Sequence, residues 1–335
     1  MPLHEDLLGN RIVVAPMAGG PSTPELVIAA SRAGALAFLA AGYKSAAAMA
    51  AEIRLVRESG IAAFGVNVFV PGLPCAEAED LAQYLKSIGA AAENGTWDDD
   101  DFVGKITALL ADPPPLVSFT FGCPDTAVIS ALRDAGSAVL VTVTSPVEAL
   151  EAAEAGADAL CVQGIEAGAH RGTFVNADGF GQDYGLLSLI GAVGQVTDLP
   201  MIAAGGIMTG GQVRAVLAAG AAAAQCGTAF LRSPESGANP LHKSALADPR
   251  YTTTQLTRAF SGRPARGLLN QFMLDHPGAP AAYPEINNAT RPLRAAAAAR
   301  GDTERMSLWA GQGYRLAADL PAAEIVALLS AGGSR

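Results

Sequence analysis

Residues 154–164 read Glu-Ala-Gly-Ala-Asp-Ala-Leu-Cys-Val-Gln-Gly and contain the unit that predicts the fold. A helical pattern over residues 146–155 ends at Gly156, and glycine is the residue that most often terminates a helix. A short apolar run over residues 159–163 follows directly and is typical of a buried strand. The stretch therefore predicts a helix that turns immediately into a strand.

The same junction recurs along the chain. Arg32-Ala33-Gly34, Asp134-Ala135-Gly136 and Ala218-Ala219-Gly220 each precede an apolar run. Repeated alternation of this kind indicates parallel strands joined by crossover helices. The expected strands are residues 11–15, 36–40, 64–70, 116–121, 138–143, 159–163, 201–204 and 223–227. The helices expected with them are residues 24–33, 45–59, 125–135, 146–155, 184–196 and 211–219, the first of them capped by Thr23.

Eight such strands favour an α/β fold of the TIM (β/α)8 barrel type. A doubly wound sheet is the alternative architecture. That fold usually carries G-x-G-x-x-G after its first strand, and no such motif follows residues 11–15.

Two regions depart from the alternation and set the expected domain boundaries. The barrel is expected to occupy residues 1–235, with an insertion at residues 71–115 that forms extra helices covering it. Residues 236–335 are too long for one closing helix and are expected to form a mostly helical lid or substrate-binding region. Its expected helices are residues 291–300 and 321–329, and the chain end can return to the barrel.

Composition excludes several classes of protein. Charged residues make up 16% of the 335, which argues against a disordered chain, and the net charge of −10 with no basic cluster argues against nucleic-acid binding. The four cysteines form no C-x-x-C pair, and Cys161 and Cys226 lie in apolar runs, as expected for buried free thiols. Residues 1–11 contain no apolar signal segment, and no apolar run reaches membrane-spanning length. A cytoplasmic protein is therefore expected.

Candidate site residues follow from the barrel, because the active sites of TIM barrels lie at the carboxyl ends of the strands. The residues expected at or just beyond these ends are Pro16, Met17, Asn67, Gln163, Gly205, Gly206, Gln225, Cys226, Gly227 and Thr228.

Two of these groups suggest a ligand. Gly205-Gly206 and Gly227-Thr228 follow the seventh and eighth strands, where such barrels often bind phosphate through backbone N–H groups. One glycine pair alone indicates only a turn, but two pairs at these strands favour phosphate. Asn67 and Gln163 are amides on buried strands and need hydrogen-bond partners. Those partners are either a flavin ring or other groups of the protein core.

The loop after the sixth strand, residues 164–172, is rich in glycine and carries His170. A histidine in such a loop can titrate near neutral pH and act in catalysis, or it can simply bond a carbonyl group. His242 and His276 are expected to be surface or loop residues, and no two histidines have zinc-ligand spacing. No metal site is predicted, and no G-x-S-x-G motif is present.

Several motifs together resemble one family. They are Ala15-Pro16-Met17-Ala18-Gly19-Gly20, Gly65-Val66-Asn67-Val68-Phe69, Gln163-Gly164 with the loop to Gly172, Ala203-Ala204-Gly205-Gly206-Ile207, Gln225-Cys226-Gly227-Thr228-Ala229-Phe230, residues 260–267 and residues 309–313. In this order and spacing, from about residue 11 to residue 314, the chain resembles the nitronate monooxygenases, formerly called 2-nitropropane dioxygenases.

The resemblance implies a TIM barrel that binds non-covalent FMN and a helical substrate-binding region. It implies that His170 is catalytic and that Asn67, Gln163, Gly168, Gly206, Gln225, Gly227 and Thr228 contact FMN. Pro16, Met17, Gly205 and Cys226 complete the expected cofactor set. Family members oxidise alkyl nitronates with O₂ to a carbonyl compound and nitrite, and propionate 3-nitronate is the expected substrate.

One residue departs from the family pattern. The loop commonly reads Gly-Gly-His in the family, and this chain has Ala169 before His170. If that position requires a positive φ, alanine is strained there.

Two other functions remain open. An NAD(P)H-dependent flavin reductase, either a quinone reductase or an FMN-type enoyl-ACP reductase, would use the same barrel and phosphate glycines. A non-catalytic binding module is the third possibility. The expected partners are a small nitronate and O₂, with no nucleic acid and no membrane, for a monomer or a homodimer.

Overall fold

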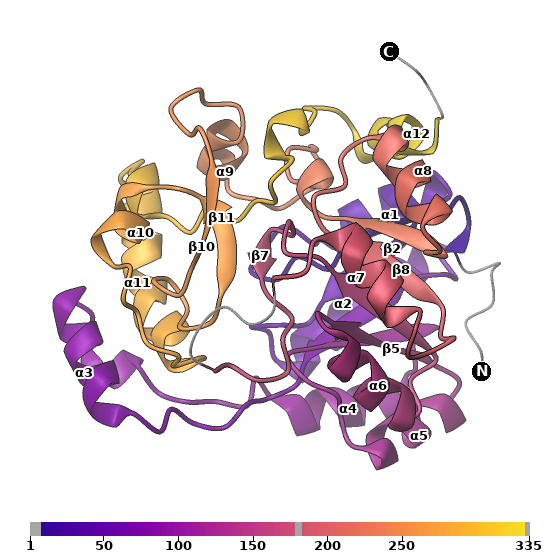
Figure 1. Cartoon of the computed structure of the whole chain (residues 1–335), viewed down its shortest axis with the longest axis horizontal. Coiled ribbons are helices and arrows are strands. Elements are labelled where there is room, and N and C mark those ends of the chain that lie inside the picture. Colours follow the sequence, from indigo (N-terminus) through magenta and orange to yellow (C-terminus); the bar gives the residue numbers. More distant parts are fainter. Residues whose placement is uncertain (1–7, 178–182, 332–335) are drawn as a thin grey trace.

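The computed structural model describes residues 8–177 and 183–331. Eight parallel strands form a closed barrel in the order β1-β2-β3-β4-β5-β6-β8-β9 (Figure 1). Strand β9 pairs with β1, with Gln225 opposite Val13, and this pairing closes the barrel. The strands are β1 (Ile12–Val14), β2 (Leu36–Ala40), β3 (Gly65–Phe69), β4 (Leu116–Thr120), β5 (Ala138–Val143), β6 (Ala159–Gln163), β8 (Met201–Ala204) and β9 (Ala223–Cys226). The predicted TIM barrel is confirmed.

The helix-ending glycines act as predicted. Gly156 has a φ of 97°, a conformation that costs glycine little and other residues more, so the chain can leave α6 and enter β6 within a few residues. Gly34, Gly136 and Gly220 have similar values. The N-caps also join residues that are close in the chain. The Thr23 side chain accepts a hydrogen bond from Leu26 N–H, and Thr209 forms a capping box with Gln212.

The core follows the alternation of side chains along each strand. Val13, Phe38, Leu140 and Ile202 belong to one buried cluster, formed mainly by strand residues from around the barrel. Their neighbours, such as Val14, pack instead against the surrounding helices. Those helices are α1 (Pro24–Arg32), α2 (Ala46–Glu58), α4 (Phe102–Ala111), α5 (Thr126–Asp134), α6 (Pro146–Glu154), α7 (Leu186–Val193), α8 (Gly210–Ala218) and α12 (Ala322–Ser330).

The last helix, α12, packs against α1, α8 and β1 (Figure 1). After the C-terminal region, the chain thus returns to the barrel wall as α12. No helix in the described ranges is long and apolar enough to cross a membrane.

The extra helices expected in residues 71–115 are present, but they do not all cover the barrel. Helix α4 lies between α2 and α5 as a regular barrel helix, whereas α3 (Ala78–Ser87) packs on α11 (Glu285–Ala299) far from the barrel wall (Figure 1, left). Tyr84 explains this placement, because its ring is buried in a cluster with Phe260 and its hydroxyl donates to the carbonyl of Ala259 at 2.6 Å.

The C-terminal region contains two strands that the sequence did not predict, in addition to helices α9 (Pro240–Ala245), α10 (Gln271–Asp275) and α11. Strands β10 (Thr254–Thr257) and β11 (Ala265–Leu268) form an antiparallel pair, and β7 (Ala169–His170) adds to its edge. His170 lies opposite Ala265 in this pairing. The loop that follows the sixth barrel strand is therefore part of the C-terminal sheet.

Candidate active site

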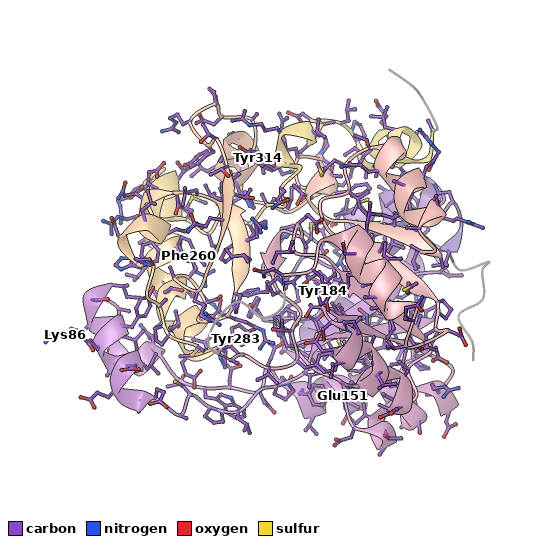
Figure 2. All side chains as sticks on the ribbon, viewed as in Figure 1. Lys86, Glu151, Tyr184, Phe260, Tyr283 and Tyr314 are labelled. Carbon is purple, nitrogen blue, oxygen red and sulfur yellow. The ribbon has the colours of Figure 1, made fainter. Side chains whose placement is uncertain are left out.

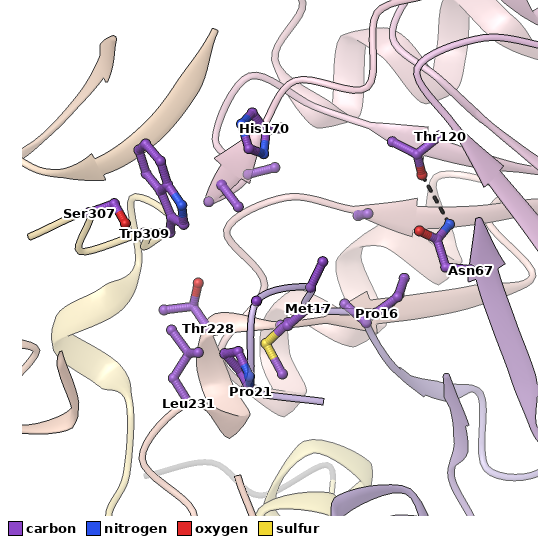
Figure 3. A pocket seen from close by; sticks show the side chains of 18 of the residues that line it. Pro16, Met17, Pro21, Asn67, Thr120, His170, Thr228, Leu231, Ser307 and Trp309 are labelled. Atoms are coloured by element: carbon purple, nitrogen blue, oxygen red, sulfur yellow. Dashed lines mark hydrogen bonds between the residues drawn. The ribbon is translucent and has the colours of Figure 1, made fainter. Parts of the chain in front are cut away.

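A cavity of about 570 Å³ lies between the carboxyl ends of the barrel strands and the C-terminal region. Figure 3 shows Met17 and Thr228 on one side of it, Asn67 with Thr120 on the other, and His170 and Trp309 at its edge. All but one of the predicted site residues line this cavity: Pro16, Met17, Asn67, Gln163, Gly168, His170, Gly205, Gly206, Gln225, Gly227 and Thr228.

Cys226, predicted as a cofactor-binding residue, is the exception, because it is buried and does not line the cavity. Adjacent strand residues point to opposite sides, so Gln225 faces the cavity while Cys226 packs in the core between strands and helices. The cysteine that does line the cavity is Cys161, whose sulfur lies 3.2 Å from Nε2 of Gln225. Both cysteines are buried free thiols, as predicted, and burial raises the pKa of each to about 12.

The two glycine-containing loops can bind an anion. Gly205 and Gly206 have φ values of 138° and 66° and line the cavity wall. Within the described ranges, the N–H groups of Gly205, Gly206, Gly227 and Thr228 have no backbone or side-chain acceptor. Oγ1 of Thr228 accepts from the N–H of Gly311 at 3.0 Å, so its own proton is free to be donated.

The two buried amides differ. Both ends of Gln163 are satisfied inside the protein: Nε2 donates to the carbonyl of His170 at 3.0 Å, and Oε1 accepts from the N–H of Gly172 at 2.9 Å. Nδ2 of Asn67 donates to Thr120 Oγ1 at 3.0 Å (Figure 3), but its Oδ1 has no donor among the described residues. Of these two amides, Asn67 is therefore the one whose oxygen accepts no hydrogen bond from the described residues.

His170 is held from both sides. Its backbone pairs with β11, and its Nε2 lies 2.9 Å from Oγ of Ser261. The Ser261 hydroxyl also lies 3.1 Å from the carbonyl of Arg263; when it donates to that carbonyl, Nε2–H of His170 is the donor in their contact and Nδ1 keeps its lone pair. The preceding residue, Ala169, has a φ of 60°. The position therefore does require a positive φ, at which alanine is strained.

The surroundings of His170 are apolar and aromatic. Its ring centroid lies 5.6 Å from the rings of Phe121 and Tyr283 and 5.7 Å from that of Trp309. Tyr283 stands between the barrel and the C-terminal region (Figure 2). Burial, and then the charges of Arg263 and Arg294, lower the pKa of His170 to about 3. The imidazole is neutral at pH 7.

Helix α11 supplies site residues that the sequence did not identify. Asn287, Arg291 and Arg294 follow one face of the helix and line the cavity. Arg294 donates to Asn287 Oδ1 at 3.0 Å and to Ser307 Oγ at 3.3 Å, and no described carboxylate pairs with it. Helical spacing could have grouped these residues only if the helix had been predicted to begin near residue 285 rather than 291.

The prediction that His242 is a surface or loop residue is wrong. It lies on α9, is 7% exposed and lines the cavity. Its Nε2 is 3.0 Å from the carbonyl oxygen of Trp309, and burial lowers its pKa to about 4. His276 is half-buried against the ring of Phe272. Its hydrogen-bond partner, Trp309, is 67 positions later in the chain, so no local pattern indicated the burial of His242.

Comparison with known proteins gives consistent matches over almost the whole chain. The family model for nitronate monooxygenase matches residues 2–332. A nitronate monooxygenase of Pseudomonas aeruginosa is 42% identical, covering 96% of each chain, and a probable nitronate monooxygenase of Staphylococcus aureus is 38% identical over 94% of this chain and 92% of its own.

Solved structures agree with these matches. The nitroalkane oxidase of Streptomyces ansochromogenes superimposes with a TM-score of 0.92 at 50% identity, covering 97% of this chain and 96% of its own. FabK from Thermotoga maritima gives a TM-score of 0.71 at 27% identity, covering 97% and 93%. From the motifs, the cavity and these matches, the chain belongs to the nitronate monooxygenase family, whose members are flavoproteins.

Proposed function

We propose that this enzyme binds FMN and oxidises alkyl nitronates with O₂ to a carbonyl compound and nitrite, with propionate 3-nitronate as a preferred substrate. One observation carries the proposal. A single cavity joins two loops whose backbone N–H groups have no acceptor in the described chain, a neutral histidine and an arginine without a carboxylate partner.

The residues present fit FMN. Its phosphate would accept hydrogen bonds from the N–H groups of Gly205, Gly206, Gly227 and Thr228, which have no acceptor in the described chain. Oδ1 of Asn67 would accept from an N–H group of the isoalloxazine ring. Bound FMN would supply the electron transfer and the reaction with O₂.

His170 would act on the substrate. A nitronate is already deprotonated at carbon, so it requires no base, and a neutral imidazole nearby does not trap the anion as an ion pair. For a neutral nitroalkane, Nδ1 of His170 would accept the α-proton, because Nε2–H is engaged with Ser261. The aromatic side chains around the ring exclude water from this step.

The preference for a carboxylated nitronate rests on α11. The guanidinium of Arg294 is oriented by Asn287 and Ser307, and Arg291 lines the same wall. Neither has a carboxylate partner among the described residues, so the wall attracts an anionic group of the substrate.

The similarity to FabK leaves a flavin reductase as the second candidate. Anaerobic mixing of the FMN-loaded enzyme separates the two functions. We expect propionate 3-nitronate to bleach the flavin absorbance rapidly and NADH to bleach it slowly. Rapid bleaching by NADH without bleaching by the nitronate would overturn the proposal.

A further inference from the structure

Tyr43 reaches the cavity from a strained loop. It lies between β2 and α2 and has a φ of 67°, and Asp100 and Asp101, which contact the same loop, have φ values of 53° and 54°. Aspartate adopts positive φ more readily than most residues, but for tyrosine it is unfavourable and persists only where surrounding contacts enforce it. Strain concentrated on a loop that carries a cavity residue points to a function for that residue.

The contacts that enforce it come from the acidic segment, residues 98–101. Oδ1 of Asp100 accepts from the N–H of Tyr43 at 2.8 Å, and its Oδ2 lies 2.7 Å from Nζ of Lys105, a side chain with no exposure. Oδ2 of Asp101 accepts from Ala46 N–H at 2.7 Å. Asp100, which is half-buried, and Asp101, which is exposed, thus support the Tyr43 loop through backbone contacts.

The loop that Asp100 and Asp101 support places the side chain of Tyr43 at the cavity wall. The ring of Tyr43 packs on Phe69 at 5.5 Å, and the guanidinium of Arg291 lies 5.7 Å from its centroid. Its hydroxyl oxygen accepts from Tyr283 at 3.2 Å. Burial raises its pKa, so the phenol keeps its proton, and that proton has no acceptor among the described residues.

The position of Tyr43 suggests what accepts that proton. Tyr283 contacts the ring of His170 on one side and bonds Tyr43 on the other. A substrate whose reacting carbon lies at His170 would therefore place its far end near Tyr43 and Arg291.

We propose that Tyr43 is a substrate-binding residue that donates a hydrogen bond to the carboxylate of the nitronate, and that Asp100 and Lys105 are positioning residues that fix it. This inference rests on the proposed function. The Tyr43 hydroxyl adds directional recognition of the carboxylate to the charge of the two arginines on α11.

The first test compares wild type with Tyr43→Phe on two substrates of equal chain length, propionate 3-nitronate and 1-propyl nitronate. The variant keeps the ring packing and loses only the hydroxyl. We expect the ratio of kcat/KM for the carboxylated nitronate to kcat/KM for the nitronate without a carboxylate to fall about tenfold, as for loss of one hydrogen bond to a charged group. Most of the change should appear in KM. FMN occupancy and Tm serve as folding controls.

The second test separates the positioning of Tyr43 by Asp100 from the effect of the charges on Asp100 and Lys105. Asp100→Asn with Lys105→Met removes both charges but keeps an acceptor for Tyr43 N–H, whereas Asp100→Ala with Lys105→Met removes the acceptor as well. We expect the first pair to retain the wild-type substrate ratio and the second to lower it as Tyr43→Phe does, with no further loss when Tyr43→Phe is added.

The outcomes distinguish the two proposals. A wild-type enzyme that oxidises neither nitronate overturns both. A wild type that oxidises both substrates, with an unchanged ratio in Tyr43→Phe, overturns only the role of Tyr43. An unchanged ratio in the Asp100→Ala pair overturns the positioning role of Asp100 and Lys105.

Discussion

Nε2 of His170 lies 2.9 Å from Oγ of Ser261, a residue 91 positions later in the chain. His170 belongs to the loop after a barrel strand, and Ser261 to the C-terminal region. With the Ser261 hydroxyl donating to the carbonyl of Arg263, the contact places the ring proton on Nε2 and leaves Nδ1 as the acceptor. The barrel supplies the imidazole, and the C-terminal region sets its orientation.

Replacing Ser261 tests this orientation. In Ser261→Ala the imidazole loses its fixed tautomer, so we expect kcat/KM for a neutral nitroalkane to fall by roughly 10-fold or more, as when a general base is misplaced. The value for the corresponding nitronate should change less, because no proton is removed. Ser261→Thr keeps the hydroxyl and should recover much of the loss. Equal losses on both substrates would contradict the assignment.

His170 itself can be removed without disturbing the predicted FMN contacts. We expect His170→Asn to keep yellow FMN and to lose kcat/KM for nitroalkanes by about 10²–10⁴-fold, the usual contribution of a general base, with a smaller loss for nitronates, from which no proton is removed. Steady-state oxygen consumption measures both. His276→Asn, outside the cavity, is the matched control. Nitronate and nitroalkane kinetics equal to wild type would remove His170 from the mechanism.

The two buried histidines make the free energy of unfolding depend on pH. Burial, with Arg263 and Arg294, lowers the pKa of His170 to about 3, and burial lowers that of His242 to about 4. In the unfolded chain both titrate near pH 6.5, so below that pH the unfolded state binds protons that the folded state does not. The free energy of unfolding should therefore fall as the pH drops from about 6.5 toward 4.

Each histidine contributes at most about 1.4 kcal/mol per pH unit in this window. Urea unfolding at several pH values measures the slope. We expect a shallower slope in His170→Asn than in wild type, and parallel slopes would argue against a neutral buried His170.

Ala169 provides a stability test. Its φ of 60° is unfavourable for alanine and easily adopted by glycine. We expect Ala169→Gly to raise the free energy of unfolding by roughly 1 kcal/mol, with the strain relief exceeding the extra entropy of the unfolded chain. Gly191→Ala, within α7 and with no atom close to the added Cβ, is a comparison with ordinary backbone and should also stabilise. A destabilised Ala169→Gly would show that the loop tolerates alanine without strain.

Thr228 links the proposed phosphate site to the C-terminal region, because its Oγ1 accepts from Gly311 N–H at 3.0 Å. Thr228→Val keeps the shape and removes the hydroxyl. We expect FMN to bind about 10-fold more weakly, in line with one lost bond to a charged group, in fluorescence titrations of the apoprotein. Thr228→Ser should bind FMN nearly as wild type does. Unaltered affinity in Thr228→Val would place the phosphate elsewhere.

The sequence by itself determined the barrel and most of the barrel side of the site. Gly156 and its equivalents, the N-cap Thr23 and the apolar runs act within a few residues, so their effect can be read locally. Once the strands are placed, parallel pairing brings all their carboxyl ends to one face, and Asn67 and Gly206 follow as cavity residues.

Only the tertiary structure decided how the cavity is closed. Ser261 at His170, Arg294 at the wall and the burial of His242 depend on pairing between β7 and β11 and on packing of α9 and α11. Such contacts join segments far apart in the chain, and no local pattern encodes which distant side chain will meet which. The free energy that fixes them comes from the burial of surfaces that exist only after both segments have folded.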